Sequence, residues 1–196
     1  DEVIATSPID LVDPLDAPRL RAEIAAVAAG EVRHYRARYR TRAGGTRWLD
    51  VTARPILDSA GALVGRVGSY RDAQAAVVLE QDLAAGEERF RAAMTNAPGG
   101  MALVAPDGRL LTVNPSFCRM LDRTESAMVS SSWQELTHPD DVGADQAMVD
   151  AILAGERDSY RIVKRYLRPD GSIVWGDLGV GCVRDEAGNV TTFISQ

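Results

Sequence analysis

The residues that could do acid–base or metal chemistry in this chain lie mainly in one short segment. His138 precedes Pro139, and Asp140 and Asp141 follow directly. An imidazole and two carboxylates can transfer protons or bind a metal ion. Consecutive residues on a helix point about 100° apart, however, so the two carboxylates cannot converge on one atom. Proline at the first helical position and acids in the first turn stabilise a helix start, and we favour that interpretation.

The other reactive side chains are scattered. Cys118 and Cys182 are the two cysteines, in segments that read as helix and strand, and they form no CxxC pair. We predict that they are buried small hydrophobes in a reducing compartment. No phosphate-binding loop, dinucleotide fingerprint, nucleophile elbow, kinase phosphoacceptor or cyclase signature occurs. We therefore expect no catalytic residue and no metal site.

Composition limits the class of protein. The chain has 196 residues, of which 45% are hydrophobic, and a formal net charge of -6. This length suits two small domains, and the charge gives no general attraction to nucleic acid or to an anionic membrane. No apolar run is long enough to span a membrane, and the first residues do not resemble a signal peptide. We expect a cytoplasmic fragment, cut at both ends, without membrane contact.

An internal repeat organises the chain. Segments in the first half recur in the second half at an almost constant offset, with one slip of two residues between Tyr35 and Tyr39. The first set is Pro14, Asp16, Ala26, Gly30 and Tyr35, which recur as Pro139, Asp141, Ala151, Gly155 and Tyr160. The second set is Tyr39, Gly44, Trp48, Asp50 and Gly61, which recur as Tyr166, Gly171, Trp175, Asp177 and Gly188. The chain therefore contains two copies of one structural unit.

The second copy can be divided into elements. Strands are predicted at 101–105 and 109–113, joined by a Pro-Asp-Gly turn. A helix follows Asn114 and Pro115, and a second helix runs from His138 to about Ala154. Three strands are predicted near 158–168, 172–184 and 189–195. This order predicts an antiparallel sheet with helices on one face, an α+β domain.

These segments resemble the PAS sensor domains with their carboxy-terminal PAC motif. In the second copy the resemblance is carried by Glu87–Ala92, Asn96–Pro98, Asp107–Gly108, Val113–Cys118, His138–Asp141, Pro169–Ser172 with Trp175, and Asp185–Gly188. In the first copy it runs from about Ser7 to Asp72. The resemblance implies a five-stranded antiparallel sheet that cups a small cavity. It also implies an incomplete first domain at 1–72, a linker helix at 73–97 and a nearly complete second domain at 98–196.

The resemblance also bears on cofactors. Heme-binding members carry their histidine inside the helix that here spans about 139–154, which contains none. The flavin photoswitch of the light-sensing members needs an Asn-Cys-Arg cysteine on a later helix, whereas Cys118 follows Phe117 on the first one. Heme and covalent flavin are therefore disfavoured, and the cofactor stays unknown.

The resemblance implies a non-catalytic module that senses a small ligand or another cue, forms a homodimer and signals through the linker helix. Any catalysis would belong to an output domain of the parent protein, such as a histidine kinase or a cyclic-dinucleotide enzyme. The alternative is a structural dimerisation and spacer module without a ligand.

Strand alternation predicts the cavity wall of the second domain. Leu178, Val180 and Cys182 share one parity and should face inward, while Asp177 should face outward. In the first copy Val51 should face inward in the same way. The complete predicted lining is Leu103, Val113, Phe117, Leu121, Met128, Trp133, Ile152, Leu178, Val180 and Cys182.

The last expectations concern dimerisation. Trp48 and Trp175 have the outward parity, so each should lie on the outer face of its sheet and be covered by a helix or a partner chain. Apolar residues of the linker follow steps of three and four, as in a coiled coil; they are Ala76, Leu79, Leu83, Phe90 and Ala93. Glycine at position 86 predicts a break, with one helix ending near Ala85 and another from Glu87 to Thr95.

Overall fold

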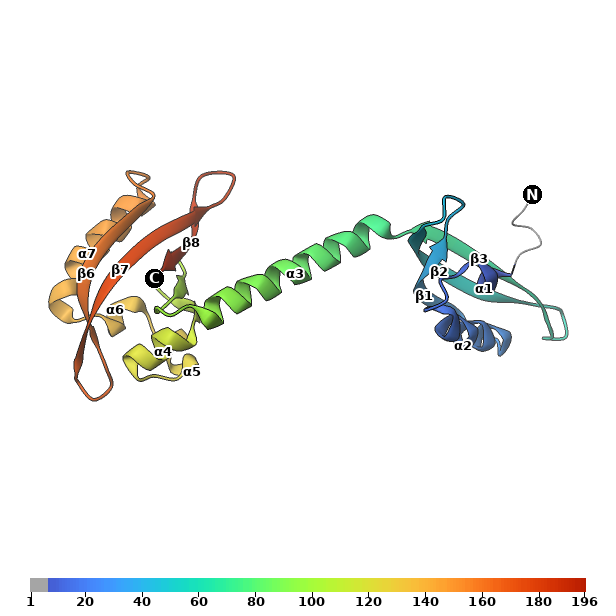
Figure 1. Ribbon diagram of the computed structural model, residues 1–196, viewed down its shortest axis with the longest axis horizontal. Helices are drawn as coiled ribbons and strands as arrows, with labels where there is room; N and C mark the ends of the chain where they lie inside the picture. The colour runs from blue at the N-terminus through green and yellow to red at the C-terminus, as the bar shows by residue number, and fades with distance from the viewer. Residues whose placement is uncertain (1–6) are drawn as a thin grey trace. The chain divides into compact units, whose positions relative to one another are not determined.

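The computed structural model describes residues 7–196, which form two compact units. Unit 1 extends to Gly86, and unit 2 runs from Glu87 to Gln196. One helix, α3 (Gln74–Asn96), crosses the boundary between them. Each unit has its own sheet and its own helices (Figure 1).

Unit 2 is built on a five-stranded antiparallel sheet. Its strands are β4 (Ala102–Val104), β5 (Leu110–Val113), β6 (Ser159–Leu167), β7 (Ile173–Arg184) and β8 (Val190–Ser195), in the order β5-β4-β8-β7-β6. Its helices are α4 (Pro115–Leu121), α5 (Glu125–Val129), α6 (Trp133–Leu136) and α7 (Pro139–Leu153). The predicted α+β class and the five-stranded sheet are confirmed.

The helix starts of unit 2 follow from local side-chain chemistry. The Asn114 side chain accepts hydrogen bonds from the N–H groups of Phe117 and Met101, both at 2.9 Å, and so caps α4. His138 Nδ1 accepts from the N–H of Asp140 at 3.3 Å at the start of α7. The structure thus gives His138 the role of a helix cap, because free N–H groups at a helix start need acceptors.

The core of unit 2 lies between the sheet and the helices, with α7 running beside β6 (Figure 1). Leu178 and Val180 are buried in it, whereas Asp177, which directly precedes Leu178 on β7, is exposed. The inward and outward faces of β7 are therefore those that alternation predicts.

Unit 1 repeats the carboxy-terminal half of this architecture. It contains α1 (Pro8–Leu11), α2 (Ala17–Ala28), and a three-stranded antiparallel sheet of β1 (Arg33–Arg40), β2 (Thr46–Leu57) and β3 (Leu63–Asp72). Val51 on β2 is buried in its core, as predicted. The hairpins β1–β2 and β6–β7 have the same register, because Arg38 faces Trp48 in one and Arg165 faces Trp175 in the other.

One ion pair fastens helix to strand in both units. In unit 2, Asp141 accepts from the backbone N–H, Nε and NH2 of Arg165 at 2.8, 3.0 and 2.6 Å. In unit 1, Asp16 accepts from the same three groups of Arg38 at 2.9, 2.9 and 3.0 Å. A bidentate guanidinium pair with an added backbone donor fixes both position and direction. We call this arrangement the Asp–Arg clamp.

The predicted break at Gly86 is wrong, because α3 is one uninterrupted helix of 23 residues. Glycine costs about 1 kcal/mol relative to alanine inside a helix. Its neighbours Ala84, Ala85, Glu87 and Glu88 are all strong helix formers, so their propensity offsets that penalty. The glycine therefore lowers local stability without ending the helix.

The clamp makes the stability of unit 2 depend on acid pH. Hydrogen bonds from Arg165 lower the pKa of Asp141 from 3.8 to about 2. A lowered folded-state pKa adds stability above the unfolded value, and that stability is lost as pH falls from about 4 to about 2. When the pH is lowered from about 4 to about 2, the unfolding free energy of unit 2, measured by urea titration, should fall less in Asp141→Asn than in the unchanged chain. Asp140→Asn is the matched control, since Asp140 is exposed and touches Arg165 through one contact at 3.3 Å. Equal losses in the chain and in Asp141→Asn would contradict the assignment.

Candidate functional site

Unit 2 contains a small cavity between its sheet and helices, with a volume of about 40 Å³. A water molecule needs about 10–15 Å³ of such space, so the cavity is large enough for about three waters or a few heavy atoms of a ligand. It is far smaller than the roughly 300 Å³ at which sites for drug-sized molecules begin. Its lining residues are Ala102, Val104, Leu110, Phe117, Trp133, Leu136, Asp145, Val149, Tyr160, Lys164, Tyr166, Leu178, Val180, Phe193 and Ser195.

A buried ion pair forms the polar part of the lining. Lys164 Nζ on β6 donates to Asp145 Oδ2 on α7 at 2.5 Å, and the two residues are 2% and 1% exposed. Lys164 Nζ also donates to Thr137 Oγ1 at 2.8 Å, and the Tyr160 hydroxyl donates to Asp145 Oδ1 at 2.6 Å. Buried charges persist where such partners satisfy them.

Aromatic rings flank the ammonium group. Lys164 Nζ lies 4.9 Å from the ring centroid of Trp133 and 4.7 Å from that of Tyr166. These distances are within the range of cation–π attraction. The Tyr166 ring meets Phe117 edge to face, with centroids 5.8 Å apart. The ammonium is therefore held by a carboxylate, a hydroxyl and two rings.

Burial changes the acidity of these groups. Desolvation lowers the pKa of Lys164, and Asp145 opposes that change. Desolvation also raises the pKa of Tyr160 and of Tyr166, and for Tyr160 the hydrogen bond to Asp145 raises it further. Both phenols thus keep their protons at neutral pH; the Tyr160 proton is donated to Asp145, so the oxygen of that hydroxyl can only accept a further hydrogen bond.

The structure places the predicted lining residues in three groups. Phe117, Trp133, Leu178 and Val180 line the cavity. A second group is buried in the same core away from the cavity and consists of Val113, Leu121, Met128 and Ile152. Cys182 is half-buried against that core.

The prediction for Leu103 is wrong. Ala102 and Val104 are the buried residues of β4 and line the cavity, whereas Leu103 between them is only half-buried and lies outside the core cluster. All of residues 101–105 are apolar. Composition therefore could not show which parity faces inward, and a one-residue change of phase exchanges the two faces.

Sequence reasoning missed the ion pair, although two signals pointed to it. Lys164 lies on the same face of β6 as apolar and aromatic residues, because it has the same parity as Tyr160, Ile162 and Tyr166. Asp145 precedes Val149 and Ile152 at helical spacing, on the buried face of α7. A charged residue in phase with a buried face is the mark of an internal pair.

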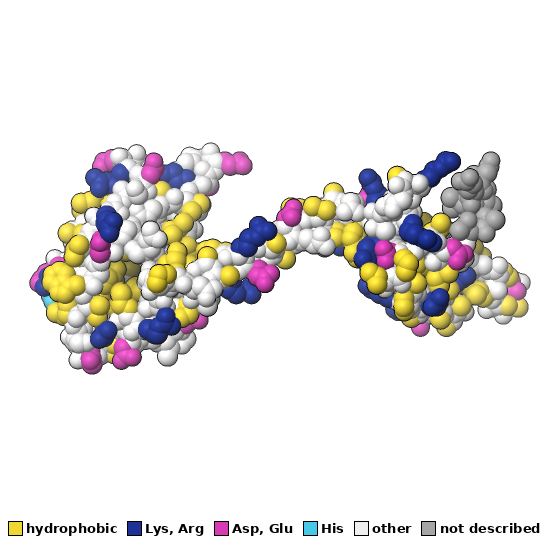
Figure 2. All heavy atoms as spheres, in the orientation of Figure 1, with side chains coloured by type: hydrophobic (Ala, Val, Ile, Leu, Met, Phe, Trp, Pro, Cys, Tyr) yellow, Lys and Arg dark blue, Asp and Glu magenta, His cyan; other side chains and the backbone are white. Residues whose placement is uncertain are grey.

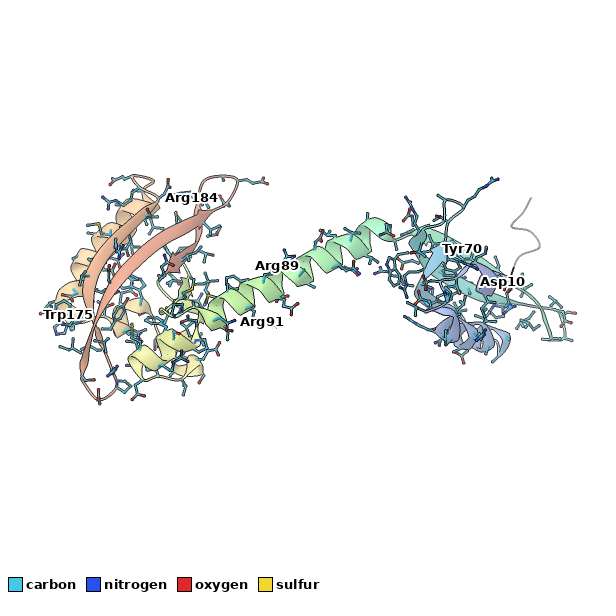
Figure 3. The ribbon with its side chains drawn as sticks, viewed as in Figure 1. Asp10, Tyr70, Arg89, Arg91, Trp175 and Arg184 are labelled. Carbon is cyan, nitrogen blue, oxygen red and sulfur yellow. The ribbon has the colours of Figure 1, made fainter. Side chains whose placement is uncertain are left out.

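The predicted dimerisation residues are exposed to different degrees. Trp175 is 66% exposed on the outer face of unit 2 (Figure 3). The Arg165 guanidinium carbon lies 5.7 Å from the centroid of its ring. Trp48 is half-buried, with Arg38 over its ring at 5.3 Å. Trp175, being mostly exposed, lacks the helix cover that was one of the two predicted options, whereas the backbone N–H of the half-buried Trp48 donates to Gln74 Oε1 at the start of α3.

The linker residues are exposed along α3, where hydrophobic side chains are visible in Figure 2. Leu79 is 71% and Leu83 72% exposed. Ala76, Phe90 and Ala93 are exposed as well. Unpaired leucines at this spacing on a helix are typical of a surface that meets another helix.

A clustered metal site and a membrane-spanning helix are both absent from residues 7–196. Within this range the side chains of His, Cys, Asp and Glu do not gather in groups of three or more that could hold a metal ion. None of the helices described in this range has the length and apolar character needed to cross a bilayer.

Comparisons with known proteins agree with the fold. Two family models, both described as PAS fold, match residues 110–195 and residues 1–78. The chain is 36% identical over 110 residues to "Probable diguanylate cyclase DgcE" of Escherichia coli (strain K12), and 29% identical over 98 residues to "Sensor histidine kinase TmoS" of Ectopseudomonas mendocina. These matches cover 56% and 50% of this chain, but only 10% of each relative.

A solved structure adds evidence for the fold alone. The PAS domain of a protein from Colwellia psychrerythraea superposes with a TM-score of 0.51 at 13% identity. The match covers 55% of this chain and 91% of that one.

The ring of Tyr166 leaves no room for a side chain at position 176. A Cβ added at Gly176 would lie 2.6 Å from Cε2 of the buried Tyr166 ring. Gly176→Ala should therefore destabilise unit 2 by about 1–3 kcal/mol through overpacking. Gly181→Ala on the same strand meets nothing within 4 Å and is the matched control. Urea unfolding of the two variants checks this expectation, which fails if they are equally stable.

Proposed function

Since the chain belongs to the PAS-fold family, with one family match in each unit, we propose that it is the sensory module of a signalling protein. In this proposal unit 2 takes a small molecule into its cavity. The occupied and empty states differ in the packing around the cavity, and α3 passes the difference to an output domain. The module itself carries no catalytic step.

The buried Lys164–Asp145 pair at the cavity wall is the observation that supports a ligand. A core whose only task is to fold gains stability by filling its space with apolar side chains. Unit 2 instead keeps an open volume beside two charged groups. Concave sites with a few convergent polar groups are the usual form of small-molecule sites.

The nature of the output domain is proposed from the relatives. The two curated relatives are named as a diguanylate cyclase and a sensor histidine kinase, and the similar region is one tenth of each. We propose that the protein to which this chain belongs likewise joins its PAS domains to a cyclase or kinase domain. Binding in unit 2 would then change the activity of that domain.

The relay needs an element with two states. Leu79 and Leu83 on α3 are exposed at coiled-coil spacing, so we propose that α3 pairs in parallel with α3 of a second copy. A change of packing between two such helices is a two-state transition that ligand binding can bias.

The second candidate is a dimerisation and spacer module without a ligand, which the exposed α3 leucines support equally well. Native mass spectrometry of the purified chain, compared with its denatured mass, separates the two. The sensory proposal predicts an added mass that is released on denaturation. A native mass equal to that of the polypeptide alone, together with no uptake of added small molecules by the cavity, would instead support the spacer module.

Pairing through α3 predicts a dimer that charge can break. Leu79→Glu with Leu83→Glu should convert it to a monomer in light scattering, because like charges would face each other across the apolar seam. Gln81→Glu, on the opposite side of the helix, is the control and should stay dimeric. A monomeric unchanged chain, or a dimer that survives the double substitution, would contradict the pairing.

A further inference from the structure

We propose that the unit 2 cavity selects a small uncharged molecule with a hydrogen-bond-accepting oxygen, which accepts from Lys164 Nζ while its apolar part lies against Val104, Phe117 and Leu178. This inference rests on the sensory function proposed above and names the class of ligand. Three observations lead to it: an internal comparison between the units, the charge balance of the site and the size of the cavity.

The internal comparison shows that unit 1 has the same clamp without an ion pair at the corresponding positions. Lys164 precedes the clamp residue Arg165, and Ala37 precedes its counterpart Arg38. Asp145 lies four residues after the clamp residue Asp141, and Leu20 lies four residues after Asp16. The strand register agrees, because Ala37 faces Leu49 and Lys164 faces the corresponding Gly176.

The counterpart positions in unit 1 are apolar and buried. Leu20 and Ala37 belong to the core of that unit. The same helix-on-strand scaffold thus closes with a leucine and an alanine. Replacing a buried ion pair by apolar residues of similar total volume is often neutral or stabilising. We infer that the pair in unit 2 serves a purpose other than folding, and its place at the cavity wall points to binding.

The charge balance of the site favours a neutral ligand. The ammonium of Lys164 is matched by the carboxylate of Asp145, so the buried site has no net charge. A charged guest would bring an uncompensated charge into a buried space, which is strongly unfavourable. An uncharged oxygen can instead accept a hydrogen bond from Lys164 without changing the net charge of the site.

The donor for that oxygen is available. An ammonium group has three N–H donors, and Lys164 uses one on Asp145 and one on Thr137. The third has no hydrogen-bond partner among residues 7–196, and Lys164, whose Nζ lies beside the rings of Trp133 and Tyr166, lines the cavity. A hydroxyl, carbonyl or amide oxygen can accept from it.

The remaining wall fixes the size and character of the guest. It is mostly aliphatic and aromatic, and the cavity volume of about 40 Å³ admits a few heavy atoms. Acetamide and n-propanol have the required oxygen, a short apolar part and no charge. Acetate has nearly the shape of acetamide but carries a negative charge, so the pair of probes isolates the effect of charge.

The test is a titration of the full chain with acetamide, n-propanol and acetate, followed by amide NMR spectra. Acetamide and n-propanol should give saturable shifts at 102–104, 164–166 and 178–180. Their dissociation constants should be in roughly the millimolar range, as expected for so few heavy atoms. Acetate should bind at least about tenfold more weakly than acetamide because of its charge.

Variants locate the binding at the pair. Asp145→Leu with Lys164→Ala reproduces the unit 1 residues and should abolish the saturable shifts. Arg161→Ala with Asp177→Ala removes an exposed ion pair between β6 and β7 and should leave these shifts unchanged. Since the comparison of acetamide with acetate uses the unchanged chain, it decides the question even if the first variant does not fold.

Each contrary result has a definite meaning. Tighter binding of acetate than of acetamide would overturn the neutral-ligand inference and leave the sensory function standing. Unchanged binding in the variant that lacks the ion pair would overturn the role of Lys164. Absence of saturable shifts with all three probes would also overturn the inference, while an added mass in native mass spectrometry would still support a sensor of another ligand class.

Discussion

The contact between Lys164 and Asp145 is the constraint on which the cavity of unit 2 depends. Removing an ammonium and a carboxylate from water costs several kcal/mol for each ion, and their mutual attraction offsets this only when the geometry is good and the remaining polar groups are satisfied. Thr137 and Tyr160 supply the added hydrogen bonds, and two aromatic rings flank the ammonium. The pair and its partners thereby connect α6, α7 and β6 at the cavity wall.

The scaffold that holds this pair is separate from the pair itself. The Asp–Arg clamp occurs with nearly the same distances in both units and fastens the helix to the strand at the edge of the core. Adjacent positions then differ, with charged residues in unit 2 and apolar residues in unit 1. A common frame with variable lining lets one copy place a charged pair beside its cavity where the other has two buried apolar side chains. In this account the division of roles between the units follows from two side chains.

The features that follow from local chemistry could be predicted from the sequence. The Pro-Asp-Gly turns, the capped start of α7 and the alternation of β7 gave the five-stranded sheet and its inward face. Around Leu103 all consecutive residues are apolar, so polar–apolar alternation could not indicate which face of the strand points inward, and the prediction chose the wrong face. At Gly86 a local propensity was overruled by its helix-forming neighbours. The assignment of residues 1–72, 73–97 and 98–196 as functional domains stays a prediction.

The ion pair was missed for a different reason. Lys164 and Asp145 are 19 residues apart on a strand and a helix, and each looks like an ordinary surface charge until its phase is compared with its apolar neighbours. Their contact exists only in the tertiary structure. The pattern could have indicated that each residue faces inward, but the distance between them required the fold.

The central claim is that this pair serves binding and is dispensable for folding. A double-mutant cycle tests it most directly, with the opening free energy of the unit 2 core measured by amide hydrogen exchange near Leu121 and Ile152. Asp145→Leu and Lys164→Ala alone should each lose about 3–5 kcal/mol, because each leaves a buried charge unpaired. Together they should return to within about 1 kcal/mol of the unchanged chain, as the apolar pair of unit 1 suggests. A double variant that is as unstable as the sum of the two single variants would show that the pair is needed to fold unit 2, and would contradict the account.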